Sequence, residues 1–350
     1  MKKLSLLQSF RAIAPVLILL LHAAQIYDVN FMYMLKFEKT GGVDLFFVMS
    51  GFLLYYIYNR KFGENGQARN FLLKRITRIM PLVWVLTLFF FAASYIGLWE
   101  PYASDELLGS LFVLPTSEHI LDTTWSLSHM VFFYLMMAIV IWQPLWRLPM
   151  LAIVSIMTLY LYRYGFLGED TILSLLTMNY YNFEFLLGCI AAAIVMKVRI
   201  RGAFVYLIAG IIGYAYTWYV MTNGIESRLP LEMMFGPAAF LLVLGGAGLD
   251  QTRNINIPKP IQILEQSSYA LYLSHYPLLI ISMYLYDVNR WFEYISSAVA
   301  YSLVCTVIVC ISTGIHYVVE KPLDRFVQRL VQPLYSKAKP KDEVKATAVQ

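Results

Sequence analysis

Long apolar segments recur along nearly the whole chain, and they restrict its fold more than any other feature. A window of about 20 apolar residues, the length of one membrane-spanning helix, identifies ten of them: 9–27, 42–59, 79–97, 125–144, 149–166, 173–196, 203–221, 231–248, 267–286 and 293–315. Of the 350 residues, 59% are hydrophobic and 14% are charged, whereas an ordinary soluble domain carries about a quarter charged residues. The sequence therefore predicts an all-α, polytopic membrane bundle of about ten transmembrane helices.

Lysine and arginine are distributed unevenly between the two sides of these helices. With the N-terminus inside, the 27 basic residues lie on the inner side or at inner helix ends, except for Lys36, Lys39, Arg163, Arg228 and Arg290. Because cytoplasmic segments carry the excess of positive charge, we expect both termini in the cytoplasm. We divide the chain into a transmembrane domain, residues 1–325, and a basic cytoplasmic tail, residues 326–350, which we expect to be disordered.

The first apolar segment contains two polar residues, in "RAIAPVLILLLH" at 11–22. The 11-residue step from Arg11 to His22 rises about 16 Å and places both side chains on one helix face. Arg11 alone is also explained as a snorkelling cytoplasmic anchor. His22 lies deeper, where ionisable groups are costly and usually face a bundle interior or a water-filled path; a structural histidine bonded to a neighbouring helix is the other interpretation.

The second segment begins with "GGVDLFFVMSG", in which Gly42, Ser50 and Gly51 suit close helix packing. Since this helix returns from the outer side, Asp44 should lie near the depth of His22. We therefore hypothesise that Asp44 orients His22 or raises its basicity. The alternative is that Asp44 only caps its own helix.

These two stretches resemble the membrane-bound acyltransferase 3 family, whose first helix carries an arginine and a histidine in this spacing and whose second carries a G-V-D-x-F-F-V-x-S-G-F block. Further matching blocks follow in family order: "KRITRIMPLVW" at 74–84, "WSLSHMVFFYL" at 125–135, "FEFLLGCIAA" at 183–192, "SYALYLSHYPLL" at 268–279 and "VVEKPL" at 318–323. The resemblance thus extends from residue 9 to about residue 325.

The resemblance implies O-acylation, usually acetylation, of a carbohydrate or similar hydroxyl acceptor by a multi-pass protein of the bacterial cytoplasmic membrane. The expected partners are cytoplasmic acyl-CoA as donor, a carbohydrate or lipid-linked glycan as acceptor, and the lipid bilayer, with no nucleic acid. Acetyl-CoA would be a substrate, so we expect no permanently bound cofactor. The three cysteines lack zinc spacing, and we predict no metal site.

The donor's phosphates suit a basic cluster at the inner face. Lys74, Arg75 and Arg78, with Arg11 nearby, are the candidate donor-binding residues, because arginine can bind phosphate through two nitrogens. The positive-inside bias alone is the competing explanation. At the depth of His22 the acceptor hydroxyl must lose its proton, and imidazole titrates near neutrality, so we predict that His22 is the general base or an acyl carrier.

Other polar residues within or beside the spans are candidate acceptor contacts. Glu184 is costly at mid-helix unless it is paired or protonated. His275, beside Pro277, and Tyr269 could contact substrate or be structural, and Trp125 could stack on a glycan or act as an interfacial anchor. Glu320 is expected to pair with basic residues at the cytoplasmic end.

One position departs from the family pattern. The fourth helix of the family usually reads W-S/T-L-x-x-E, and this chain has Met130 at the glutamate position with His129 beside it. Either that glutamate is dispensable, or His129 replaces it, or the acceptor or the activity is altered.

A transporter or flippase for a lipid-linked glycan is the alternative function, because ten helices with intramembrane polar residues would suit one. We find no convincing internal repeat that would support it. A passive scaffold is a weaker alternative, since it has little reason to keep His22, Asp44 and Glu184 within its spans.

Overall fold

The computed structural model describes residues 4–98, 101–115, 119–164, 179–289 and 296–335, and within these ranges the regular structure is entirely helical. The principal helices are α1 (Ser5–Ile26), α2 (Gly42–Tyr58), α3 (Gln67–Ala93), α4 (Ser104–Phe112), α5 (Trp125–Trp142), α6 (Arg147–Tyr164), α8 (Tyr181–Lys197), α9 (Ala203–Thr222), α10 (Leu231–Thr252), α11 (Lys259–Asn289), α12 (Ser297–Ile315) and α13 (Lys321–Val331). The all-α fold is therefore confirmed.

Eight of the helices or continuous helical segments in the described ranges are long and apolar enough to cross a membrane. They correspond to eight of the ten predicted spans. The other two predicted spans form α8, with 17 residues, and α11, with 31 residues. Residues 165–178, which include the start of the predicted span 173–196, lie outside the described ranges. The count of ten spans and the cytoplasmic placement of both termini stay predictions.

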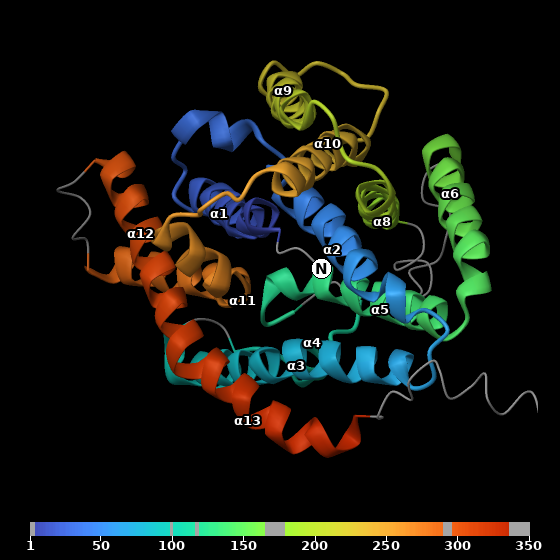
Figure 1. Ribbon diagram of the computed structural model, residues 1–350. Helices are drawn as coiled ribbons and strands as arrows, with labels where there is room; N and C mark the ends of the chain where they lie inside the picture. The colour runs from blue at the N-terminus through green and yellow to red at the C-terminus, as the bar shows by residue number, and fades with distance from the viewer. Residues whose placement is uncertain (1–3, 99–100, 116–118, 165–178, 290–295, 336–350) are drawn as a thin grey trace, which may run out of the picture.

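The helices form a bundle in which α1 packs against α11, and α2 packs against both α8 and α10 (Figure 1). Helices α6 and α9 lie at the edges of the bundle in Figure 1, and many of their large apolar side chains are exposed. Because exposed apolar surface is stable in a hydrocarbon environment, these faces fit contact with lipid.

Small residues allow the central helices to approach closely, as the sequence predicted. A Cβ atom added to Gly188 would lie 1.9 Å from the carbonyl oxygen of Val48, and one added to Gly51 would lie 2.0 Å from that of Phe185. The backbones of α2 and α8 thus touch directly. This contact brings the polar residues near their N-terminal ends, Asp44 and Glu184, into one cluster.

The predicted boundary at residue 325 between the transmembrane domain and the tail falls inside helix α13, so residues 326–331 are helical rather than disordered. Helix α13 continues to Val331 and is followed by a short turn, Gln332–Leu334. Figure 1 shows α13 running along the same side of the bundle as α3, to which Gln328 is joined by a hydrogen bond to Thr77 (3.1 Å). The helix forms because its apolar and charged residues alternate with helical spacing, a pattern that extends past residue 325. Residues 336–350 lie outside the described ranges.

Candidate active site

A cavity of about 370 Å³ lies among α1, α2, α3, α5 and α11. Its polar lining includes three arginines and three tyrosines: Arg11, Arg75, Arg78, Tyr134, Tyr269 and Tyr272. The rest of its wall is mostly aliphatic and aromatic. The cavity therefore combines a cationic wall with an apolar one, which suits an anionic molecule that also has an uncharged arm.

Helix α1 contributes a single stripe of residues to this cavity. Gln8, Arg11, Pro15 and Ile18 line it, at steps of three and four residues that keep them on one helix face. His22 lies one turn beyond Ile18 on the same helix face and is not among the residues that line the cavity. The cavity thus covers the part of the predicted face from Gln8 to Ile18.

The three arginines of the cavity differ in how far they are already paired. Arg11 forms an ion pair with Glu265 at 3.3 Å. Arg78 is bound by two acidic residues, Glu320 at 2.7 Å and Asp324, so the predicted pairing of Glu320 with a basic residue is confirmed.

Arg75 is the cavity arginine with the least polar compensation in the described part of the chain. Its Nε is buried without a hydrogen-bond partner there, and its guanidinium lies 5.7 Å from the ring centres of Tyr58 and Phe71 and 6.0 Å from that of Tyr134. Such cation–π contacts hold the group in place and leave its charge available to an anion.

Lys74 does not join this cluster. It lines a different pocket, with Asn70 and residues of α13 and the turn after it, and its Nζ lies 5.6 Å from the ring centre of Tyr335. Arg78 follows Lys74 by four residues and Arg75 by three, so the helical repeat alone would let it share a face with either; the two pockets are what separate Lys74 from Arg75 and Arg78. The prediction that all three bind one ligand is not supported for Lys74.

His22 pairs with a residue from the far end of the sequence. Its Nδ1 lies 3.2 Å from Nε2 of His275, and the two rings stack with centres 5.3 Å apart. The ring of Tyr276 meets His22 edge-on. His275 is fully buried whereas His22 is partly exposed, so His275 contacts His22 from the interior of the bundle.

The structure gives no support to the hypothesis that Asp44 orients His22. Asp44 is fully buried and forms an ion pair with Lys39 at 3.0 Å, and no side-chain capping bond forms at the start of α2. The two residues separate because Asp44 packs toward α8 and α10, whereas His22 packs toward α11.

Lys39 is the centre of a second polar group, which we call the Lys39 cluster: Lys39, Asp44, Tyr181, Glu184 and Glu232. The Nζ of Lys39 lies 3.0 Å from Oε1 of Glu232 and donates a hydrogen bond to the Tyr181 hydroxyl at 3.2 Å. Burial opposes the charge of Lys39, but the surrounding carboxylates outweigh it and raise the pKa of Lys39 well above its usual range. The lysine therefore stays protonated.

In the sequence Lys39 was identified only as a basic residue on the outer side. The sequence nevertheless indicated that a cation is needed there, because two carboxylates predicted inside spans, Asp44 and Glu184, require one nearby. Lys39 precedes Asp44 by five residues. Which of the outer cations serves them is decided by the packing of α2, α8 and α10.

The remaining predicted contacts divide between the two sites. Tyr269 lines the cavity and donates a hydrogen bond to the carbonyl of Ile79 (2.9 Å). Glu184 and Trp125 lie with the Lys39 cluster: the carboxyl of Glu184 interacts with Asp44 and Lys39, and the Trp125 ring packs against Tyr181 with centres 5.5 Å apart.

Met130 and its neighbour His129 point in different directions. Met130 lines the cavity, so the position that is usually glutamate in the family faces the site. His129 is buried, its Nδ1 donates to the carbonyl of Trp125 (3.1 Å), and its ring packs among Phe47, Trp125 and Tyr181. The direction of its side chain gives no support to the replacement of the glutamate by His129.

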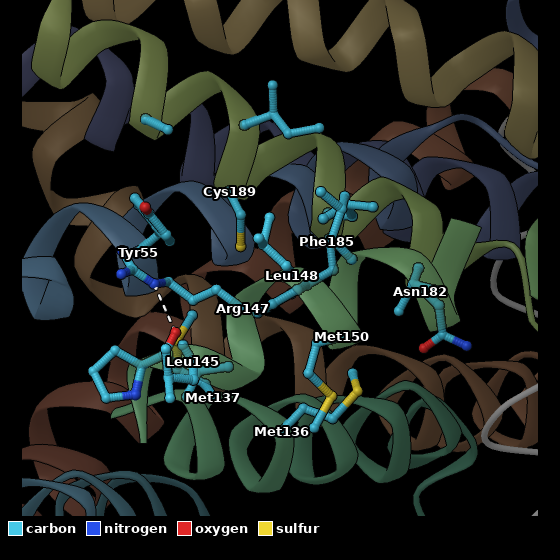
Figure 2. Close-up of a pocket in the computed structure, with 17 residues that line it drawn as sticks. Tyr55, Met136, Met137, Leu145, Arg147, Leu148, Met150, Asn182, Phe185 and Cys189 are labelled. Atoms are coloured by element: carbon cyan, nitrogen blue, oxygen red, sulfur yellow. Dashed lines mark hydrogen bonds between the residues drawn. The ribbon is translucent and has the colours of Figure 1, made fainter. Parts of the chain in front are cut away.

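A second cavity, of about 510 Å³, lies between α5, α6 and α8 (Figure 2). Its wall is mainly aliphatic, aromatic and sulfur-containing, with Arg147 and Tyr55 on the same side of the view in Figure 2. None of the predicted site residues lines it. Its lining suits hydrocarbon rather than a polar substrate.

Comparison with known proteins agrees with the motifs. A family model described as an acyltransferase domain matches residues 6–317. The chain is also similar to the exopolysaccharide production protein ExoZ of Rhizobium meliloti (strain 1021), with 27% identity over 257 residues that cover 68% of this chain and 78% of the relative. No solved structure matches it. The matched region contains both the arginine cavity and the histidine pair, and the chain belongs to the membrane-bound acyltransferase 3 family.

Proposed function

We propose that this membrane acyltransferase moves an acetyl group from acetyl-CoA to a hydroxyl of a cell-envelope or exported polysaccharide, with His22 as the general base. The observation that carries the proposal is the single stripe on α1, which lines the cavity from Arg11 to Ile18 and reaches His22 one turn beyond it. The similarity to a protein of exopolysaccharide production supports a carbohydrate acceptor.

The cationic end of the cavity suits the phosphates of the donor. Arg75 is available to an anion, and Arg11 and Arg78 could exchange their carboxylate partners for phosphate oxygens. From there the pantetheine arm would extend along the apolar wall. The rise of about 16 Å between Arg11 and His22 is comparable with its reach.

At the far end of the cavity the thioester would meet the acceptor near His22. In the proposed step the acceptor oxygen forms a bond to the acetyl carbon, and the carbon–sulfur bond of the thioester breaks. The hydroxyl proton passes to His22 and then to the departing thiolate, which leaves as coenzyme A. General-base assistance of this kind contributes about 10²- to 10⁴-fold to a rate.

The donor would enter from the cytoplasm, since the arginines lie toward the end of α1 that we expect to face inward. The protein is accordingly proposed to lie in the cytoplasmic membrane with both termini inside. The acceptor would approach from the opposite side, where the outer loops and the Lys39 cluster lie.

The test compares envelope glycans of a strain lacking the protein with strains that express wild type, His22→Ala or His119→Gln. His119 lies in the segment that precedes α5, where its Nε2 donates to the carbonyl of Leu114 (2.7 Å), so His119→Gln is a matched histidine control. Alkali-labile O-acetyl groups, measured by NMR, should vanish in the deletion and in His22→Ala and return with the other two proteins.

Three outcomes would count against the proposal. Unchanged O-acylation of every envelope glycan in the deletion strain would remove the proposed acceptor class, and full acylation with His22→Ala would remove the general base. An unchanged acyl content with the glycan in the wrong compartment would favour the alternative, a transporter or flippase.

A further inference from the structure

The direction of the hydrogen bonds around His275 can be assigned from the backbone. Its Nδ1 lies 3.1 Å from the carbonyl oxygen of Leu271 and 2.9 Å from that of Tyr272. A carbonyl oxygen can only accept, so Nδ1 of His275 must carry a proton. The backbone of α11, which carries His275, therefore determines which nitrogen of the His275 ring is protonated.

His275 is held in its neutral form by its surroundings. It is fully buried, and no carboxylate hydrogen-bonds to it among the residues that the structure describes. A second proton would place an unpaired charge in that interior, which is costly. With its one proton on Nδ1, Nε2 of His275 has only a lone pair and acts as an acceptor.

This assignment determines the proton on His22. Nδ1 of His22 lies 3.2 Å from Nε2 of His275, and a hydrogen bond between them requires His22 to donate. His22 therefore carries its proton on Nδ1, and its own Nε2 is left with a free lone pair. The ring of His22 is partly exposed, whereas that of His275 is not.

We infer that His275 is a positioning residue, which keeps His22 in the tautomer whose Nε2 can take a proton. The inference rests on the proposed function and deepens it. When Nε2 of His22 accepts the proton of the acceptor hydroxyl, Nδ1–H continues to donate to His275, so the imidazolium keeps its partner. The proton leaves from the same Nε2 to the thiolate, and His275 needs neither to gain nor to lose one.

The first test reads the tautomer directly and does not depend on activity. In protein with ¹⁵N-labelled histidine, reconstituted in nanodiscs at neutral pH, the imidazole signal that His22→Ala removes identifies His22, and this signal should show an unprotonated Nε2 and a protonated Nδ1. In His275→Leu the proton of His22 should redistribute between the two nitrogens. A wild-type His22 with its proton on Nε2 would overturn the inference, even if acyl transfer proceeds normally.

The second test uses two amides that replace different parts of the imidazole. A glutamine at 275 places its amide oxygen near the former Nε2 and can still accept from His22, whereas an asparagine reaches only the region of Nδ1. We expect His275→Leu and His275→Asn to lower kcat by about 100-fold or more with the KM for acetyl-CoA unchanged, and His275→Gln to recover at least tenfold of that loss.

The variants also separate a positioning role from a structural one. Equal losses in all three variants, or a loss that lies in KM, would contradict the inference. If His22→Ala keeps full acyl transfer while the wild-type tautomer is as assigned, then the general base of the proposed function is wrong and the tautomer assignment stands.

Discussion

Removal of the cation of the Lys39 cluster should destabilise the fold by a measurable amount. Lys39 lies 3.0 Å from the fully buried Asp44 and 3.0 Å from Glu232. Lys39→Met keeps the aliphatic length but leaves Asp44 buried without its counter-ion. Breaking a buried pair in this way costs about 3–5 kcal/mol.

A double-mutant cycle distinguishes the ion pair from a general packing effect. Asp44→Asn on its own also breaks the pair, whereas in the double variant no charge of that pair remains unpaired, so the double variant should be less destabilised than the sum of the two single variants by about 1 kcal/mol or more. Glu232 is partly exposed, so Glu232→Gln should cost no more than about 1 kcal/mol.

The assay is equilibrium unfolding in mixed detergent micelles, followed by tryptophan fluorescence. The pKa of Lys39 is raised in the folded protein, so its contribution is fully present below the unfolded pKa of about 10.4 and is lost only as the pH rises through the higher folded value. The cost of Lys39→Met should therefore be constant between pH 6 and pH 9 on this account. A cost below about 1 kcal/mol, or simple additivity in the double variant, would show that Lys39 does not compensate the buried charge of Asp44.

Three further outcomes follow from the structure. Arg75→Gln should raise the KM for acetyl-CoA about tenfold or more, since charge-assisted bonds to phosphate are worth about 1.5–3 kcal/mol. Lys74→Gln should leave this KM within about twofold. Equal changes of KM for the two variants in steady-state kinetics would contradict the assignment of Arg75, and not Lys74, to the donor. Gly188→Ala should destabilise the protein by about 1–3 kcal/mol, because the new Cβ meets a backbone oxygen. Gly314 has open space around it, so Gly314→Ala should be neutral or slightly stabilising in the same unfolding assay. Burial lowers the pKa of His119, so protonation opposes folding as the pH falls below about 6.5; thermal unfolding at pH 7.5 and pH 5 should show a smaller acid loss in His119→Gln than in wild type.

Helical geometry explains why much of the site could be predicted. The 11-residue step from Arg11 to His22 closes about three turns, so both residues had to share a face of α1 whatever its neighbours. The same periodicity does not separate Lys74 from the other donor-binding candidates, since Arg78 follows Lys74 by four residues and Arg75 by three; their division between two pockets is a result of packing. Glycines at 42 and 51 indicated close packing before any helix was placed.

Partners across long sequence separations could not be obtained in this way. His22 and His275 are 253 residues apart, and Asp44 was an equally reasonable partner by depth alone. Depth along a helix follows from residue number, but the direction in which a helix face points depends on which helices surround it. The end of the described chain is a similar case: α13 keeps a helical pattern past residue 325, but its contacts with α3 through Asp324 and Gln328 depend on packing.

Composition, local motifs and the helical repeat are enough to establish the membrane class, the family and the alignment of Arg11 with His22. The contact of His22 with His275, the pairing of Lys39 with Asp44 and the position of Arg75 at a cavity appear only once the helices are packed. Hydrogen bonds and ion pairs act over a few ångströms, and residues so distant in the chain come within that range only through this packing.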